Sequence, residues 1–166
     1  MLRSVIKNKK AQESMSIPFG FIFALILIVV FILAAIYGIN FFLNISKCSQ
    51  VGFFYDDLQN KVNSAFEAQT YNDYFELKVP GATKICFGNL TAPITNQLDY
   101  QAIDIYQYED ANTFIVPSSS ACNLPFKQIA RLNITEITKQ QNPYCVNIGS
   151  KINIKRDFYD RSVLIK

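Results

Sequence analysis

The sequence predicts an α+β protein in which a single N-terminal transmembrane helix, extended into an amphipathic helix, precedes a small antiparallel β-rich extracellular domain. Three observations predict this architecture. The 166-residue chain has no charged residue between Glu13 and Lys47, apolar residues then recur at helical spacing, and strand-like runs separated by turn residues follow from Tyr74. We expect four segments: a basic cytoplasmic tail at 1–13, the transmembrane helix at 14–46, the amphipathic helix at 47–70 and the extracellular domain at 71–166.

The uncharged run is long enough to cross a membrane. Residues 17–43 (IPFGFIFALILIVVFILAAIYGINFFL) are almost wholly apolar, and about 20 apolar residues span the ~30 Å hydrocarbon core as a helix. Ser16 is a candidate cap, and Pro18 falls in the first turn, where a missing N–H costs nothing. A helix buried in a soluble core seldom runs this long without a charge. The apolar part of a cleaved secretory signal is shorter, at about 7–15 residues, so we expect the run to be retained in a lipid bilayer.

The charges beside the run predict its orientation. Four basic residues precede it, and the chain from Cys48 onward is close to neutral. The positive-inside rule therefore places the N-terminus in the cytoplasm and the large domain outside the cell membrane. The near neutrality of that domain also argues against nucleic acid binding. Three N-x-S/T sequons lie on the same side, so Asn44, Asn89 and Asn133 are candidate glycosylation sites.

After the run, a stripe of apolar residues predicts that the helix continues, or restarts after a kink near residues 44–49, through about Gln69. The stripe recurs at steps of three and four, while polar residues occupy the other face. It comprises Val51, Phe54, Tyr55, Leu58, Val62, Ala65 and Phe66. Such a stripe needs a partner, and we expect the following sheet to provide it.

From Tyr74 the pattern changes to short alternating runs, which predict six to eight strands. The predicted strands are 74–79, 84–87, 102–108, 113–116, 130–135, 144–148, 151–155 and 161–165. Residues 109–112 suggest one hairpin, and Gly149-Ser150 suggests a second, two-residue hairpin. Residues 117–125 contain two prolines and three serines and are expected to form a loop.

All four cysteines follow the apolar run, which suits an oxidising compartment. They are Cys48, Cys86, Cys122 and Cys145, separated by 38, 36 and 23 positions. Without a C-x-x-C pair, a Cys₄ zinc site is not expected, and two disulfides are the better interpretation. Three connectivities exist. We favour Cys122–Cys145, worth about 3 kcal/mol in the loop-entropy model, together with Cys48–Cys86.

The residues that most enzymes use are missing or poorly placed. The chain has no histidine, which removes the commonest general base and the commonest metal ligand. Asp56 and Asp57 are adjacent, so on a helix they point in different directions and are poorly placed to share a proton as a dyad. The carboxylates at 99–110 match no calcium loop. We therefore expect no enzymatic activity, no catalytic residue, no metal site and no cofactor.

Small residues in the apolar run form two small-xxx-small pairs. Gly20 and Ala24 form one pair, and Ala34 and Gly38 form the other. Fourteen residues separate the pairs, which is nearly four helical turns, so both lie on roughly one face. Because small residues let helices approach closely in lipid, they predict contact with another copy or with other membrane helices.

The N-terminal layout Lys9-Lys10-Ala11-Gln12, shortly before the apolar run, resembles the class III signal peptide of archaeal type IV pilin-like proteins. The resemblance covers about residues 7–45. It implies that a signal peptidase cuts between Ala11 and Gln12 on the cytoplasmic side and that the hydrophobic segment is kept. Ser16 stands at the fifth mature position, where pilins often carry an acid.

The resemblance also implies a function. In that family the retained helix forms an assembly core and carries a β-rich head outside, which implies a membrane-anchored, surface-displayed structural subunit or minor pilin. The alternative is a single-pass surface protein that serves a membrane complex as a binding or accessory module and never polymerises.

Overall fold

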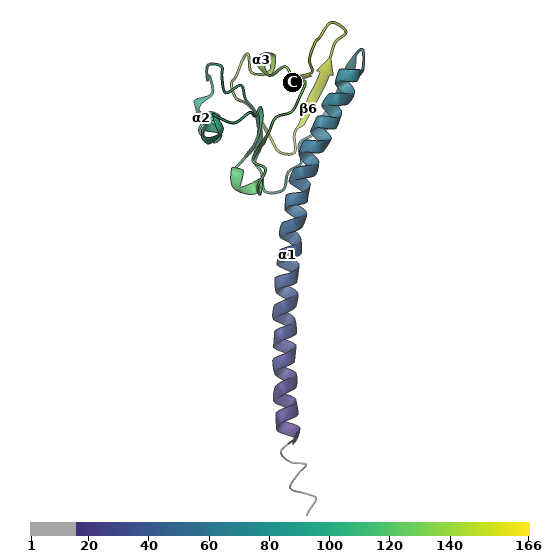
Figure 1. Cartoon of the computed structure of the whole chain (residues 1–166), viewed down its shortest axis with the longest axis vertical. Coiled ribbons are helices and arrows are strands. Elements are labelled where there is room, and N and C mark those ends of the chain that lie inside the picture. Colours follow the sequence, from purple (N-terminus) through teal and green to yellow (C-terminus); the bar gives the residue numbers. More distant parts are fainter. Residues whose placement is uncertain (1–15) are drawn as a thin grey trace, which may run out of the picture. The chain divides into compact units, whose positions relative to one another are not determined.

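The computed structural model describes residues 16–166, with side chains from Phe19 onward. The predicted basic tail at 1–13 lies outside the described residues. The chain divides into two compact units, Met1–Asn44 and Ile45–Lys166. We call the second of these the head. A long N-terminal apolar helix followed by antiparallel sheets confirms the predicted α+β class (Figure 1).

The helix α1 runs from Ser16 to Glu67 and contributes residues to both units. No break interrupts it at residues 44–49. At its C-terminal end, Nη1 of Arg156 donates hydrogen bonds to the carbonyl oxygens of Phe66 (2.7 Å) and Ala68 (2.5 Å). A cation bonded to the last carbonyls stabilises a helix terminus, because these groups have no partner within the helix.

The head contains two antiparallel sheets. One has the strand order β1-β6-β7, with β1 at Tyr71–Glu76, β6 at Lys151–Arg156 and β7 at Leu164–Ile165. The other has the order β4-β3-β2-β5, formed by Phe126–Lys127, Thr113–Val116, Lys84–Phe87 and Tyr144–Asn147. Short helical segments lie between strands: α2 (Gln97–Tyr100), η2 (Asp104–Tyr106), η3 (Ser118–Ser120) and α3 (Ile134–Ile137).

The main core of the head forms where α1 packs against both sheets. Six of the seven residues in the predicted stripe are at most 4% exposed, and the seventh, Phe66, packs against the same core at its edge. Both sheets contribute to this core, which includes Ile85, Ile115, Ile152 and Ile154. Burying one such side chain contributes about 1.5–3 kcal/mol, so the stripe holds α1 and the sheets together.

The two sheets differ in how their second faces are covered. On the sheet β4-β3-β2-β5, a smaller cluster around Cys86, Ile103 and Phe114 covers the face away from the main core. On β1-β6-β7, Ile152 and Ile154 face the main core, and the alternating residues of the opposite face form no second cluster among the described residues. That face stays largely open.

Two predicted strands are wrong. Residues 102–108 form turns and the 3₁₀ segment η2 rather than a strand, so the expected hairpin at 109–112 does not form. Residues 130–135 contain only an isolated bridge from Leu132 to Val163 and then enter α3. The physical reason in the second case is local, because Oδ1 of Asn133 accepts a hydrogen bond from the Glu136 N–H and caps the helix.

The predicted hairpin at Gly149-Ser150 is also wrong, although the chain turns there and Gly149 has a positive φ of 84°. Strand β5 pairs with β2, whereas β6 pairs with β1 and β7. The two strands therefore belong to different sheets. The helix ends at Glu67 rather than near Gln69, and the first strand begins at Tyr71 rather than Tyr74.

Asn142 fixes the loops that connect the head strands. It is 2% exposed, and its Nδ2 donates to the carbonyl oxygens of Asn89 and Pro93 at 2.8 and 3.1 Å. Its Oδ1 accepts from the Asn89 N–H at 3.0 Å. Buried backbone groups need such partners, so this side chain positions both the loop after β2 and the start of β5.

Candidate functional site: an exposed apolar helix and a pocket in the head

The most extensive candidate site is the apolar surface of α1 in the N-terminal unit. The large apolar side chains between Phe19 and Ile45 are 40–75% exposed. By length and composition this is the one described helix that could cross a membrane. An apolar surface of this extent is far larger than monomeric soluble proteins expose, which makes it the first candidate for an interaction surface.

The four small residues of the predicted packing face are exposed on this helix. Gly20, Ala24, Ala34 and Gly38 lie on α1 with accessible surfaces. A Cβ atom added at Gly20 or Gly38 would meet nothing within 4 Å. The described part of the chain therefore leaves this face free for another helix.

The three candidate glycosylation sites have different surroundings. Asn44 is exposed on α1, next to the apolar residues of the N-terminal unit. Asn89 follows β2, and its Oδ1 accepts hydrogen bonds from the N–H and the Oγ1 of Thr91 at 3.2 and 2.8 Å. Asn133 is the cap of α3. Within the head, Asn89 and Asn133 therefore lie on separate segments, the loop after β2 and the start of α3.

All four cysteines form disulfides, but the favoured pairing was wrong. Cys48 pairs with Cys122, and Cys86 pairs with Cys145. The first bond joins α1 to the loop after η3, 74 positions later in the sequence. The second joins directly opposite residues of β2 and β5. The predicted pairing favoured the two cysteines that are nearest in the sequence. In the structure, the packing of α1 and the pairing of β2 with β5 determine which cysteines meet.

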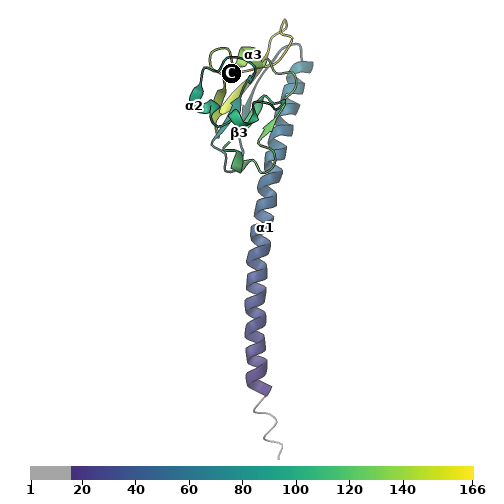
Figure 2. The same cartoon turned by 60° about the vertical axis from the view of Figure 1, so that its left-hand side comes forward.

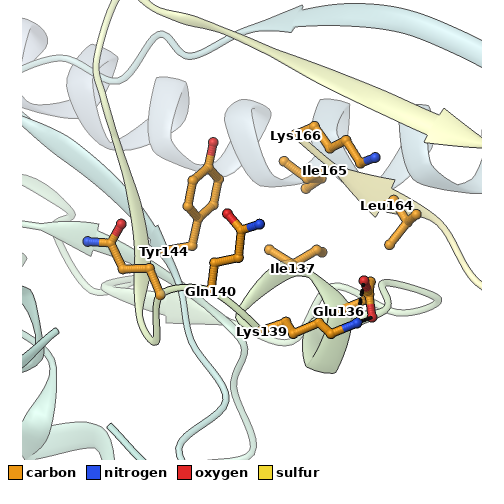
Figure 3. Close-up of a pocket in the computed structure, with 9 residues that line it drawn as sticks. Glu136, Ile137, Lys139, Gln140, Tyr144, Leu164, Ile165 and Lys166 are labelled. Atoms are coloured by element: carbon orange, nitrogen blue, oxygen red, sulfur yellow. Dashed lines mark hydrogen bonds and ion pairs between the residues drawn. The ribbon is translucent and has the colours of Figure 1, made fainter. Parts of the chain in front are cut away.

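The head has a pocket of about 570 Å³ beside β7 (Figure 3). Its lining comes from α3, the segment before β5, and the last residues of the chain. The lining residues are Glu136, Ile137, Lys139, Gln140, Gln141, Tyr144, Leu164, Ile165 and Lys166. Sequence reasoning missed this pocket, because its residues come from three separate elements and carry no local motif.

Two of the charged side chains that line this pocket pair with each other. Nζ of Lys139 lies 3.2 and 3.3 Å from the two carboxylate oxygens of Glu136, which neutralises both charges. Among the described residues, no group of three His, Cys, Asp or Glu side chains could hold a metal ion.

Some carboxylates of the head form ion pairs with lysines. Asp56 pairs with Lys127 at 2.9 Å, and Asp99 pairs with Lys84 at 2.7 Å. Burial alone would raise the pKa of Asp99, but hydrogen bonds from Lys84 and Asn96 outweigh burial and hold that pKa below its ordinary value. The Asp99 side chain is only 16% exposed, so this pair is the most shielded ion pair of the head.

The lowered pKa of Asp99 predicts a pH-dependent contribution to stability. A carboxyl with a depressed pKa stabilises the folded state above its unfolded pKa, here 3.8, and loses that contribution as pH falls through the folded value. Asp99→Asn should destabilise the head by about 1 kcal/mol at pH 6. The difference from the parent chain should shrink as pH drops below 4.

Urea unfolding of the full chain in detergent at pH 6 and pH 3 checks this prediction. Asp104→Asn is the matched control, since Asp104 forms no ion pair among residues 16–166. It should leave the unfolding midpoint unchanged at pH 6. A difference between Asp99→Asn and the parent that grows on acidification would contradict the assigned role.

The predicted cleavage position, Ala11 and Gln12, lies outside the described residues. In comparisons with protein-family models, curated proteins and solved structures, no match to this chain was found.

Proposed function

We propose that this chain is a single-pass membrane protein that displays its head on the outer surface and serves as a structural subunit resembling a type IV pilin-like subunit or minor pilin. The observation that carries the proposal is the apolar surface of α1, 40–75% exposed from Phe19 to Ile45. In this proposal α1 is anchored in the bilayer, and its small residues contact the same helix of other copies.

Two features support an outer location of the head. The disulfides Cys48–Cys122 and Cys86–Cys145 suit an oxidising compartment. The basic residues before α1 suit a cytoplasmic N-terminus. The sequons at Asn89 and Asn133 belong to the head as well, so glycosylation at these positions is part of the proposal.

Mass spectrometry of the native N-terminus tests the assembly role. Cleavage by a signal peptidase after Ala11 would leave a mature chain that begins at Gln12, and we expect that mass. Intact Met1 in the mature protein would count against the pilin-like role. Negative-stain microscopy of sheared surface material should then show the chain in filaments.

The second candidate is a non-polymerising accessory protein of a membrane complex. Ser16 favours it, because this position in the proposed mature chain lacks the acid that pilins often carry. A protease-protection experiment tests where the head is located, independently of whether the chain assembles into filaments. A head that is cleaved by protease added outside intact cells, on a chain absent from filaments, would support this second function.

A further inference from the structure

The open face of the sheet β1-β6-β7 carries a mixed basic and apolar surface. On β6, Lys151, Asn153 and Lys155 alternate with Ile152 and Ile154, which face the core. Across from them stand Tyr74, which is 64% exposed, and Leu164, which is half-buried because it also packs against the edge of the main core. We call this surface the sheet face; it comprises Asn72, Tyr74, Glu76, Lys151, Asn153, Lys155, Leu164 and Lys166.

The sheet face has an excess of positive charge. Glu76 is neutralised by Lys78 at 2.8 Å, and Lys155 is neutralised by Asp157 at 2.8 Å. Lys151 and Lys166 are exposed and form no ion pair within residues 16–166. The pocket beside β7 adjoins this face, because Leu164 and Lys166 also line it.

A second surface of the head has the complementary character. The segment 97–110 exposes Leu98 (81%), Ile105 (70%) and Tyr108 (92%). Its acids Asp104, Glu109 and Asp110 have no ion pair within the described chain, and the segment contains no basic residue. We call this segment the acidic surface.

The acidic surface is held in place by packing. Ile103 is completely buried and packs with Phe114 in the smaller core cluster. Tyr106 stacks on Phe114 with ring centroids 6.2 Å apart. The inward side chains thus fix the segment on the second sheet, and the outward ones are presented at fixed positions to a partner.

We propose that the acidic surface of one head docks on the sheet face of a second copy of this chain. The argument is complementarity. Three unpaired acids and exposed apolar side chains of one copy would meet two unpaired lysines, Tyr74 and the partly exposed Leu164 of the other, beside a pocket lined by both polar and apolar residues. Complementary charge fixes partner and register, while apolar burial supplies affinity. The acidic surface packs on the sheet β4-β3-β2-β5, whereas the sheet face belongs to β1-β6-β7 (Figure 1 and Figure 2), so one copy offers two separate surfaces to its neighbours.

A contact between two different surfaces is heterologous, and such contacts generate rings or open filaments rather than closed dimers. The inference rests on the proposed function, since it describes how heads would meet in the proposed assembly. It adds a specific interface to the contact between helices.

Photo-crosslinking of the full chain in the membranes of expressing cells tests this interface. A benzophenone amino acid replaces Tyr108, and mass spectrometry maps the cross-linked peptides. We expect links between copies that map to residues 71–76 or 151–166. Either Asp104→Lys/Glu109→Lys/Asp110→Lys or Lys151→Glu/Lys166→Glu should reduce these links by roughly fivefold or more, because like charges then face each other.

The chain carrying all five reversals is the decisive variant, since opposite charges meet again and the links should return. Asp57→Lys/Glu67→Lys is the matched control, as it reverses exposed acids outside both surfaces and should leave the links unchanged. Disulfide mapping verifies that each variant folds with the native pairs. Links to another region, links to a different protein, no links between folded copies, or no rescue by the five reversals would overturn the interface.

The experiments distinguish failure of the proposed interface from failure of the proposed function. Filaments and a mature N-terminus at Gln12 without links from position 108 would overturn the interface alone. A head protected from protease added outside the cells would overturn the proposed function itself.

Discussion

Truncating Leu58 to alanine is expected to lower the free energy of unfolding of the head by about 2–5 kcal/mol. Leu58 is completely buried on α1, inside the core that α1 shares with both sheets. Removing its methyl groups loses their transfer free energy and leaves a cavity. Because small domains have only about 5–15 kcal/mol of stability in total, this single change is large enough to threaten folding.

Urea unfolding in detergent, followed by the near-ultraviolet circular dichroism of the tyrosines, measures this loss. Leu98→Ala is the matched control, because it makes the same chemical change at a side chain that is 81% exposed. Surface substitutions usually change stability by less than about 0.5 kcal/mol. Equal losses in the two variants would show that α1 does not carry the core.

The part of the fold that the sequence predicts best is the helical stripe. Val51, Leu58, Val62 and Ala65 repeat at helical spacing over four turns, and one element covers that whole length. The strands at Lys84–Phe87 and Thr113–Val116 also have the predicted bounds, because turn residues or a proline limit them. Hydrophobic periodicity predicts an element correctly when the pattern repeats over several turns or when turn residues or proline mark the ends of the element.

The failures occur where local side-chain bonds compete with an alternating pattern. Asn96 accepts a hydrogen bond from the Asp99 N–H at the start of α2, and Asn133 caps α3 in the same way. The structure does not keep the alternation of 102–108, since Ile103 is buried whereas Ile105, which a strand would place on the same face, is 70% exposed. Ile103 and Tyr106 instead contact the smaller core cluster three positions apart, as the period of a 3₁₀ turn predicts. Over so few residues, hydrogen bonds from short polar side chains compete with the strand ladder.

The disulfide pairing and the pocket depend on contacts that no local pattern encodes. Cys86 meets Cys145 because β5 pairs with β2 rather than with its sequence neighbour β6. The pocket likewise needs α3, Tyr144 and β7 to come together. Four cysteines define only three possible pairings, so the tertiary topology selects one that spacing alone disfavoured.

Placing two arginines in the apolar run, as Ile28→Arg/Leu33→Arg, is expected to abolish stable membrane association. The 19 Leu, Ile, Val and Phe residues of 17–43 contribute about 0.3–0.6 kcal/mol each to insertion, or about 6–11 kcal/mol together. Each arginine near the centre of the span costs about 2.5–3.5 kcal/mol. Two of them offset most of the gain, whereas a single arginine would leave insertion clearly favourable.

Flotation of membranes from expressing cells, followed by carbonate extraction, measures the association. Ile105→Arg/Leu124→Arg is the matched control, since it makes the same two changes at exposed positions of the head and should stay in the membrane fraction. If the Ile28→Arg/Leu33→Arg chain also stayed there, the apolar surface of α1 could not be what holds the protein. Loss of both variants would instead show that the head contributes to the attachment. Only loss of the first with retention of the second assigns the anchor to the uncharged segment of α1.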